Sequence, residues 1–217
     1  MRAYEGGSVS KAEESKTYIA GKLTGDDWRK FKAKLVVGGD HEIWASAYED
    51  FFRQRLKLRY LDPIELLGAP GSWQGEGFSI VSIQCALIEF LAATRSGKNY
   101  RFLRKGDVLG PHDYSSSSAL FQDFLSGVAP FSTAFDADSA KDFYQAIRCA
   151  LLHEARTRNG WRIWVSGSKP IDSARKIVYR DALQAAILTF VDDYGRALLT
   201  SPLLQEAFIR KFDDLAA

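Results

Sequence analysis

The sequence predicts a mainly α-helical protein, because apolar residues recur at helical spacing over several long stretches and strand-type patterning is confined to one short region. The 217 residues are 46% hydrophobic and 26% charged, which is typical of a globular protein. A chain of this length can bury a full hydrophobic core without disulfide or metal support. The formal net charge of +2 argues against a protein whose main role is to coat nucleic acid, although it is compatible with a local basic site.

The N-terminal region is expected to form an extension, residues 1–40, ahead of a helical domain that spans residues 41–217. Residues 1–16 are polar and predict a loose or lightly tethered arm. Residues 17–37 carry mixed signals for a short strand and for a helix. A glycine pair at 38–39 then marks a break.

Three helices are predicted in the first half of the domain. Residues 42–60 show one buried stripe, and Pro63 is expected to end or bend that helix. Residues 78–94 are apolar nearly all round, with Glu89 as the single charge, so this helix is expected to be central. The serines at 115–118 are candidates for the N-cap of a third, short helix.

The second half predicts further helices and the strand region. A capping-box-like pattern at Ser139 marks the start of one helix. Aromatic and β-branched residues at 161–165 and 177–179 suggest a small β-hairpin. A long amphipathic helix follows at 180–199, and Ser201 before a proline predicts the N-cap of the last helix. The expected architecture is a helical bundle with one small β-hairpin and an N-terminal extension.

Several classes of site are excluded by composition. The two cysteines, Cys85 and Cys149, lie in apolar helical stretches and are expected to be buried reduced thiols, so neither a disulfide framework nor a Cys-rich zinc site is expected. Three scattered histidines predict no metal centre, and without a phosphate-binding glycine loop no cofactor is expected. No signal peptide is evident, and no apolar stretch approaches the ~20 residues of a membrane span. We therefore expect a cytoplasmic protein that does not enter a membrane.

The candidate catalytic residues are Arg148 and His153, which lie late in a predicted helix with four residues between them. RNA can be cut without metal when its 2′-hydroxyl attacks the adjacent phosphate. That reaction needs a general acid or base that titrates near neutrality, which is a property of histidine. It also needs fixed positive charge on the phosphate oxygens, which an arginine fork supplies.

The surrounding sequence resembles the HEPN superfamily, whose ribonuclease members carry an Arg-x(4–6)-His motif. Arg148 and His153 match that motif, within Ile147-Arg148-Cys149-Ala150-Leu151-Leu152-His153-Glu154-Ala155 and the following Asn159-Gly160-Trp161-Arg162-Ile163. The resemblance covers residues 78–199. It implies a HEPN-like helical bundle, a metal-independent endoribonuclease that leaves a 2′,3′-cyclic phosphate and a 5′-hydroxyl, and a role as a toxin or phage-defence effector. The implied partners are single-stranded RNA and an antitoxin or other regulatory protein.

One geometric point bears on the oligomeric state. On an ideal helix, side chains five positions apart point about 140° away from each other. Arg148 and His153 can therefore converge if the helix loosens between them or if two copies face each other. HEPN ribonucleases generally work as two-fold dimers, and a two-fold axis would gather both copies of the motif, so we expect a homodimer.

Supporting residues are assigned less directly. Arg156, Arg158 and Arg162 follow the motif and are candidates to hold flanking RNA phosphates, or else they are cations at a solvated helix end. Glu89 is a candidate to project into the cleft and orient the motif, or else it is a peripheral or salt-bridged glutamate. The basic residues between 29 and 34 are interpreted as an exposed face rather than an RNA grip.

Two alternatives stay open. The first is a catalytically inactive HEPN-like module that binds RNA, a nucleotide or a partner protein. Cys149, at a position that is often polar in the family, and the modest net charge favour this alternative. The second is an interaction protein whose helical surface only dimerises.

Overall fold

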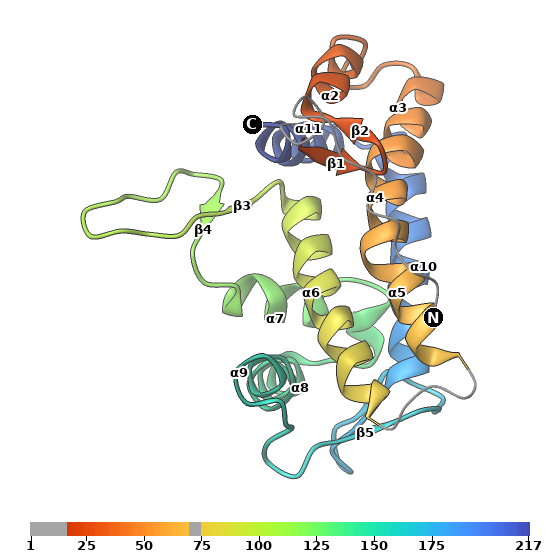
Figure 1. The fold of residues 1–217 in the computed structure, drawn as a ribbon, viewed down its shortest axis with the longest axis vertical. Coiled ribbons are helices and arrows are strands. Elements are labelled where there is room, and N and C mark those ends of the chain that lie inside the picture. The colour runs from red at the N-terminus through yellow and green to blue at the C-terminus, as the bar shows by residue number, and fades with distance from the viewer. Residues whose placement is uncertain (1–16, 70–74) are drawn as a thin grey trace, which may run out of the picture.

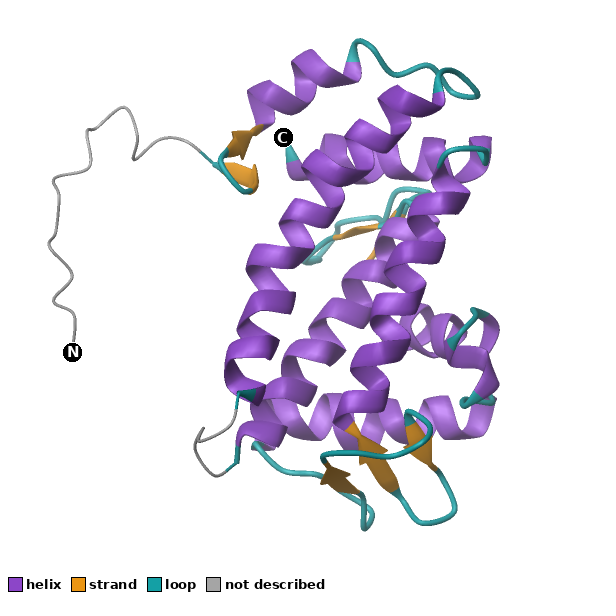
Figure 2. Ribbon diagram, turned by 90° about the vertical axis from the view of Figure 1, so that its right-hand side faces the viewer, coloured by secondary structure: helices purple, strands orange, loops and turns teal. Residues whose placement is uncertain are grey.

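Helices dominate the computed structural model, which describes residues 17–69 and 75–217, so the predicted mainly α class is confirmed (Figures 1 and 2). The arm predicted for residues 1–16 lies outside the described residues. The α-helices are α2 (Gly25–Lys32), α3 (His41–Ala47), α4 (Gln54–Leu56), α5 (Asp62–Gly68), α6 (Glu76–Ser96), α7 (Ser118–Gly127), α8 (Ala137–Phe143), α9 (Ala150–Glu154), α10 (Arg180–Leu198) and α11 (Pro202–Leu215).

Other segments link or flank these helices. Wider π-helical turns are η1 (Tyr48–Arg53), η2 (Lys57–Leu61) and η4 (Tyr144–Cys149), and η3 (Phe131–Thr133) is a 3₁₀ turn. The strands are β1 (Tyr18–Ala20), β2 (Leu23–Thr24), β3 (Asn99–Tyr100), β4 (Asp113–Tyr114), β5 (Arg162–Trp164), β6 (Ile171–Asp172) and β7 (Ile177–Tyr179).

Helix α6 is the centre of the bundle. It contacts α5, α7, α10 and α11, and Figure 2 shows the long helices of the bundle running alongside one another. Val81, Leu87 and Ala93, which point in three different directions around the helix, are all buried. This confirms the central position predicted for residues 78–94, because a helix that is apolar all round must be covered on every side.

The sequence-based expectation about apolar length is wrong for α6. Its 21 residues are long and apolar enough, by length and composition alone, to cross a membrane. However, 61% of its most apolar window is buried inside the fold, as in the core helix of a soluble protein. We therefore attribute its hydropathy to its central position.

Of the two effects predicted for Pro63, an end or a bend of the first helix, the end does not occur. The chain stays helical from α3 through η1, α4, η2 and α5 to Gly68. Pro63 falls in the first turn of α5, where a missing backbone N–H is tolerated, and the π-helical turn η2 directly precedes it.

Residues from the predicted extension pack into the same core as the helical domain. Trp28 on α2 is completely buried against Phe51 and Phe212, with ring-centroid distances of 5.1 and 5.3 Å. Its indole Nε1 donates to Asp213 Oδ1 at 2.9 Å. A capping box between Thr24 and Asp27 starts α2. The described residues before 41 are therefore an integral part of the bundle.

The start of α8 lies three residues earlier than the capping pattern at Ser139 indicates. Asp136 is the N-cap, and its side chain accepts from the Ser139 backbone N–H at 2.7 Å. Ser139 instead closes the box from position N3. Ser139 therefore belongs to a capping box, as predicted, but it occupies position N3 and not the N-cap.

The predicted hairpin between residues 161–165 and 177–179 is not the one that forms. Strand β5 pairs with β7 in parallel, and the antiparallel partner of β7 is β6. The strand order is therefore β5-β7-β6. Strand β6 lies within a polar connection and was not predicted. A two-residue strand is too short to show the alternating pattern by which strands are recognised in a sequence.

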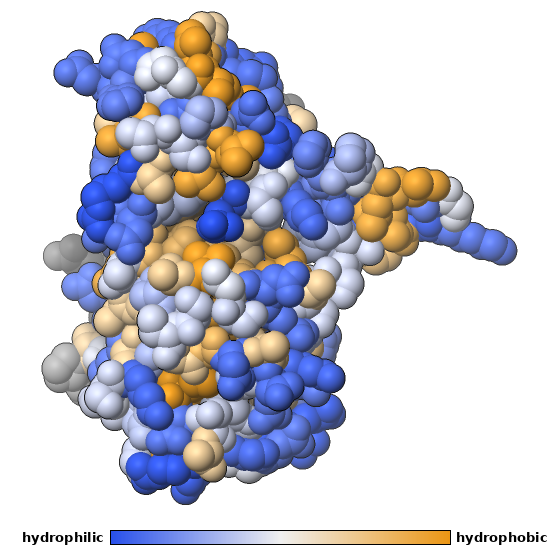
Figure 3. Space-filling model, turned by 180° about the vertical axis from the view of Figure 1, so that it is seen from behind, coloured by the Kyte–Doolittle hydropathy of each residue, from blue (hydrophilic) through white to orange (hydrophobic). Residues whose placement is uncertain are grey.

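A long loop between β3 and β4 projects from the body (Figure 1). The two strands at its base pair in parallel. Phe102 and Val108 on this loop are 78% and 91% exposed, and Figure 3 shows apolar side chains along the projection. The base of the loop lies beside the residues described next.

We expect Trp28→Ala to lower the free energy of unfolding by about 3–5 kcal/mol, because it empties a fully buried aromatic site. Urea denaturation measures this change. The control is Val36→Ala at a side chain that is 66% exposed, for which the expected change is within about 0.5 kcal/mol. A small effect at Trp28 would mean that residues 17–40 are dispensable for the bundle.

Candidate functional site

The motif lies on one continuous helical segment, α8–η4–α9, with Arg148 in its π-helical turn. A π-helical turn widens the helix locally, and such turns are frequent at functional sites. The segment ends at Ala155, whose left-handed φ of 52° closes α9. His153 therefore lies in the last turn, close to the negative end of the helix.

Arg148 is held by Glu89 from the central helix. Its Nη2 lies 2.8 Å from Glu89 Oε2, and the two side chains are 17% and 19% exposed. The guanidinium also lies over the ring of Tyr144, 5.4 Å from the centroid. Burial lowers the pKa of Arg148, but the hydrogen bond and charge of Glu89 outweigh it, so the pKa is raised.

A second layer of hydroxyl groups holds this pair. The Tyr114 hydroxyl donates to Glu89 Oε1 at 3.4 Å. The Tyr144 and Ser117 hydroxyls lie 3.1 Å apart. Burial and the Glu89 charge raise the pKa of Tyr114, so its phenol stays protonated and remains a donor. Glu89 and Arg148 are thereby fixed in orientation.

These groups open onto a polar cavity of about 420 Å³. It is lined by Glu89, Tyr100, Ser115, Ser116, Ser117, Tyr144 and Arg148. Ser117 is the N-cap of α7 but makes no side-chain capping bond, so the N-terminal N–H groups of this ten-residue helix lack that partner. A helix N-terminus next to an arginine is a favourable place for a phosphate.

His153 does not line this cavity. Its side chain is exposed on α9 and makes no hydrogen bond or ion pair within residues 17–69 and 75–217. It lies five positions after Arg148, a rise of about 7.5 Å along a helix. A single chain therefore presents the two motif residues on adjoining but separate surfaces.

The other predicted site residues fall into two groups. Glu89 lies in the cavity with Arg148, whereas Arg156 and Arg158 do not line it. Both arginines bind Glu154, with Arg156 Nε at 2.6 Å from its Oε2. Arg162 is on β5, with its guanidinium 5.8 Å from the Trp164 ring centroid. These three arginines follow the motif in sequence but form no cluster with Arg148.

Sequence reasoning missed the tyrosines of the site. Tyr144 precedes Arg148 by four residues, so a helical-face argument could have found it. Tyr100 and Tyr114 are brought together by the parallel pairing of β3 and β4, which no local pattern indicates. The serines at 115–117 were identified only as helix-capping candidates.

The described residues contain no group of three or more His, Cys, Asp or Glu side chains that could hold a metal ion. Both cysteines are free thiols. Cys85 is buried, and burial raises its pKa to about 12. Cys149 is partly exposed, so the expectation of a buried thiol is wrong there.

No protein-family model, curated protein or solved structure matches the chain. The chemistry present is a fixed guanidinium in a polar cavity, a helix N-terminus beside it, and an imidazole on the adjoining surface.

A double-mutant cycle measures the coupling between Glu89 and Arg148. We expect Glu89→Gln to lower the free energy of unfolding by about 1–3 kcal/mol, because it leaves a largely buried guanidinium without its counter-charge. Combined with Arg148→Gln, the cycle should give a coupling of about 1 kcal/mol or more.

The control cycle uses the ion pair of Arg29 with Asp26, whose side chains are 58% and 75% exposed. Its coupling should stay below about 0.5 kcal/mol, because water screens exposed pairs. Equal couplings for the two pairs would contradict the assigned environment of Glu89 and Arg148.

Proposed function

We propose that the protein is a metal-independent endoribonuclease of the HEPN type that acts as a homodimer on single-stranded RNA. Arg148 binds the phosphate that is attacked, and His153 transfers protons. The same proposal includes a HEPN-like arrangement of the bundle and a role as a toxin or phage-defence effector, both of which rest on the resemblance of residues 78–199. Its cellular partners would include an antitoxin or other regulatory protein.

The availability of the Arg148 guanidinium is the observation that supports this proposal most. Glu89 engages its Nη2, and Arg148 makes no other hydrogen bond within the described residues. An arginine has five N–H donors in a planar fork, so donors remain for a bidentate contact with phosphate oxygens. The Glu89 and Tyr144 contacts pre-orient the fork, which favours stabilisation of charge that builds up on the phosphate.

RNA cleavage requires two proton transfers, and these are easier to explain with two copies of the chain than with one. When the 2′-hydroxyl attacks phosphorus, a base takes its proton, and an acid gives a proton to the departing 5′-oxygen. The bond from phosphorus to the 5′-oxygen breaks as the bond to the 2′-oxygen forms. One chain offers one motif histidine, so two chains supply both the base and the acid. The products are a 2′,3′-cyclic phosphate and a 5′-hydroxyl.

The surface around His153 suits such a dimer. Leu152, its neighbour on α9, is 51% exposed and offers an apolar contact at the end of the helix. A two-fold axis beside this end would bring the imidazole of one copy towards the cavity of the other. Such an interface would compensate for the separation of Arg148 from His153 in a single chain.

A second candidate is a phosphate-binding module without catalysis. The observation that favours it is the position of His153 outside the cavity that Arg148 lines. In this case Arg148 and the N-terminus of α7 would bind an RNA or nucleotide phosphate, and no bond would be cut.

We expect the purified protein to cleave end-labelled single-stranded RNA in EDTA and to leave 2′,3′-cyclic phosphate ends. Arg148→Ala and His153→Ala should each slow cleavage by about 100-fold or more, because each removes a group that acts in the transition state. His41→Ala is the matched control, since His41 is also exposed but lies on α3. Its rate should equal that of the wild type. Wild-type protein that binds RNA without cutting it would replace the ribonuclease with the binding module.

Mixing wild-type protein with an excess of the double variant Arg148→Ala/His153→Ala tests the shared site. If the base and the acid come from two copies, a mixed dimer holds a single motif histidine. The cleavage rate per wild-type chain should then fall about tenfold at a tenfold excess of the double variant after subunit exchange. The same mixture before subunit exchange is the control. A rate per wild-type chain that stays constant after exchange would exclude a site built across the dimer.

A further inference from the structure

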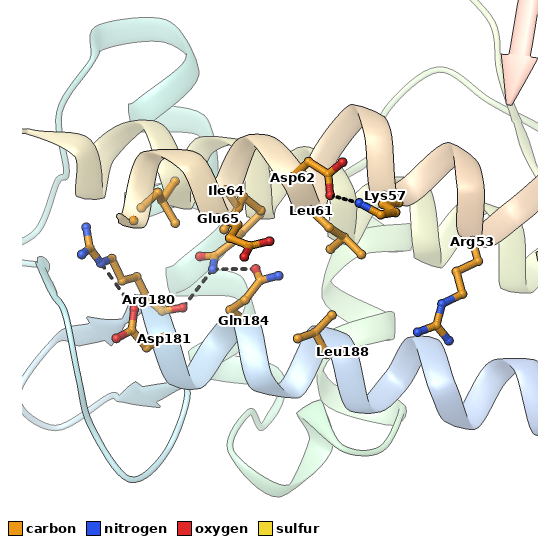
Figure 4. A pocket seen from close by; sticks show the side chains of 13 residues that line it. Arg53, Lys57, Leu61, Asp62, Ile64, Glu65, Arg180, Asp181, Gln184 and Leu188 are labelled. Carbon is orange, nitrogen blue, oxygen red and sulfur yellow. Dashed lines mark hydrogen bonds and ion pairs between the residues drawn. The ribbon is translucent and has the colours of Figure 1, made fainter. Parts of the chain in front are cut away.

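A second cavity, of about 560 Å³, lies between α5, α6 and α10, away from the residues around Arg148 (Figure 4). Leu61, Ile64, Ile80 and Leu188 provide its apolar walls. This volume is within the range of small-molecule sites, and spaces between the helices of a bundle commonly hold ligands. No step proposed for RNA cleavage uses any of these residues.

Two buried polar atoms of the lining residues have no hydrogen-bond partner among the described residues, Gln84 Oε1 and Arg180 Nε. Arg180 Nε lies 3.5 Å from Asp181 Oδ1 in an ion pair, so Gln84 Oε1 is the one left without a counterpart. Gln84 is fully buried, and its Nε2 donates to the Arg180 carbonyl at 2.9 Å and to Gln184 Oε1 at 3.1 Å (Figure 4). Its Oε1 is buried with no hydrogen-bond partner. An unpaired buried acceptor is costly, so Gln84 Oε1 is suited to receive an N–H or O–H from a molecule that enters the cavity.

The charged side chains around the cavity indicate whether that molecule carries a positive or a negative charge. Each cation in the lining already has a carboxylate partner: Lys57 pairs with Asp62 at 2.6 Å, Arg53 with Asp192 at 3.3 Å and Arg180 with Glu76 at 2.7 Å. Glu65 has no ion pair within the described residues. Figure 4 shows its side chain pointing towards Gln184 across the gap between α5 and α10. The unpaired charge of the lining is therefore negative.

We propose that this cavity binds a small organic cation, specifically a primary amine on an aliphatic chain. Its ammonium group donates to Glu65 and to Gln84 Oε1, with a small adjustment of the buried amide. Its chain packs against the apolar walls at Ile64 and Leu188. A ligand carboxylate would be repelled by the negative charge of Glu65. A pure hydrocarbon would leave the Gln84 Oε1 acceptor without a hydrogen-bond donor.

Calorimetric titration of the full chain with n-hexylammonium tests this site, with n-hexanoate and n-hexanol as comparison probes. We expect saturable binding of n-hexylammonium and at least tenfold weaker binding of the other two. Glu65→Gln should weaken n-hexylammonium binding at least fivefold.

A cavity-filling variant locates the binding. Leu188→Trp should abolish binding of n-hexylammonium, whereas Leu203→Trp on α11 should leave it unchanged. Both leucines are exposed, at 42% and 77%, and equal circular dichroism spectra would establish that both variants fold. Absence of binding, equal binding of n-hexanoate, or binding insensitive to Glu65→Gln or Leu188→Trp would overturn the proposal. None of these readouts involves RNA, so they are independent of the proposed ribonuclease.

Discussion

The burial of α6 is the constraint on which the rest of the structure depends. A helix that is apolar nearly all round must be covered on every side, and α5, α7, α10 and α11 supply that cover. Any polar side chain that it carries must then find a partner inside the fold. Gln84 and Glu89 are in this position, and each lines one of the two cavities described above. Five positions apart, they point about 140° away from each other, so they face different sides of the bundle.

The Glu89–Arg148 pair shows how this constraint shapes a site. Taking two charges out of water costs free energy that their attraction repays only when the geometry is good and other hydrogen bonds assist. Here the tyrosine hydroxyl from β4 supports Glu89, and the ring of Tyr144 supports the guanidinium. Such a pair is a poor device for stability alone, because apolar side chains of similar size would serve as well. It places an oriented arginine in the lining of an open polar cavity.

The separation of His153 from that cavity has a local cause. The π-helical turn η4 widens the helix at Arg148, but α9 resumes regular geometry before the histidine and ends one residue after it. An exposed imidazole at a helix end is free to meet an element from another chain. The position of Arg148 is thus decided by the core of one chain, whereas the working position of His153 under the proposed mechanism is decided by assembly.

The sequence by itself determined those features that depend on neighbours along the helix or on the immediate cap. The extents of α6 and α10, the N-cap at Ser201 and the placement of Arg148 and His153 on one helix follow from spacing of three or four residues. The tertiary structure alone decided that Trp28 joins the main core, that β5 pairs in parallel with β7, and that Glu89 meets Arg148 across 59 residues of chain. Periodicity tells which face of an element is apolar, but it does not tell which other element covers that face. That choice is made by packing among all of the elements at once.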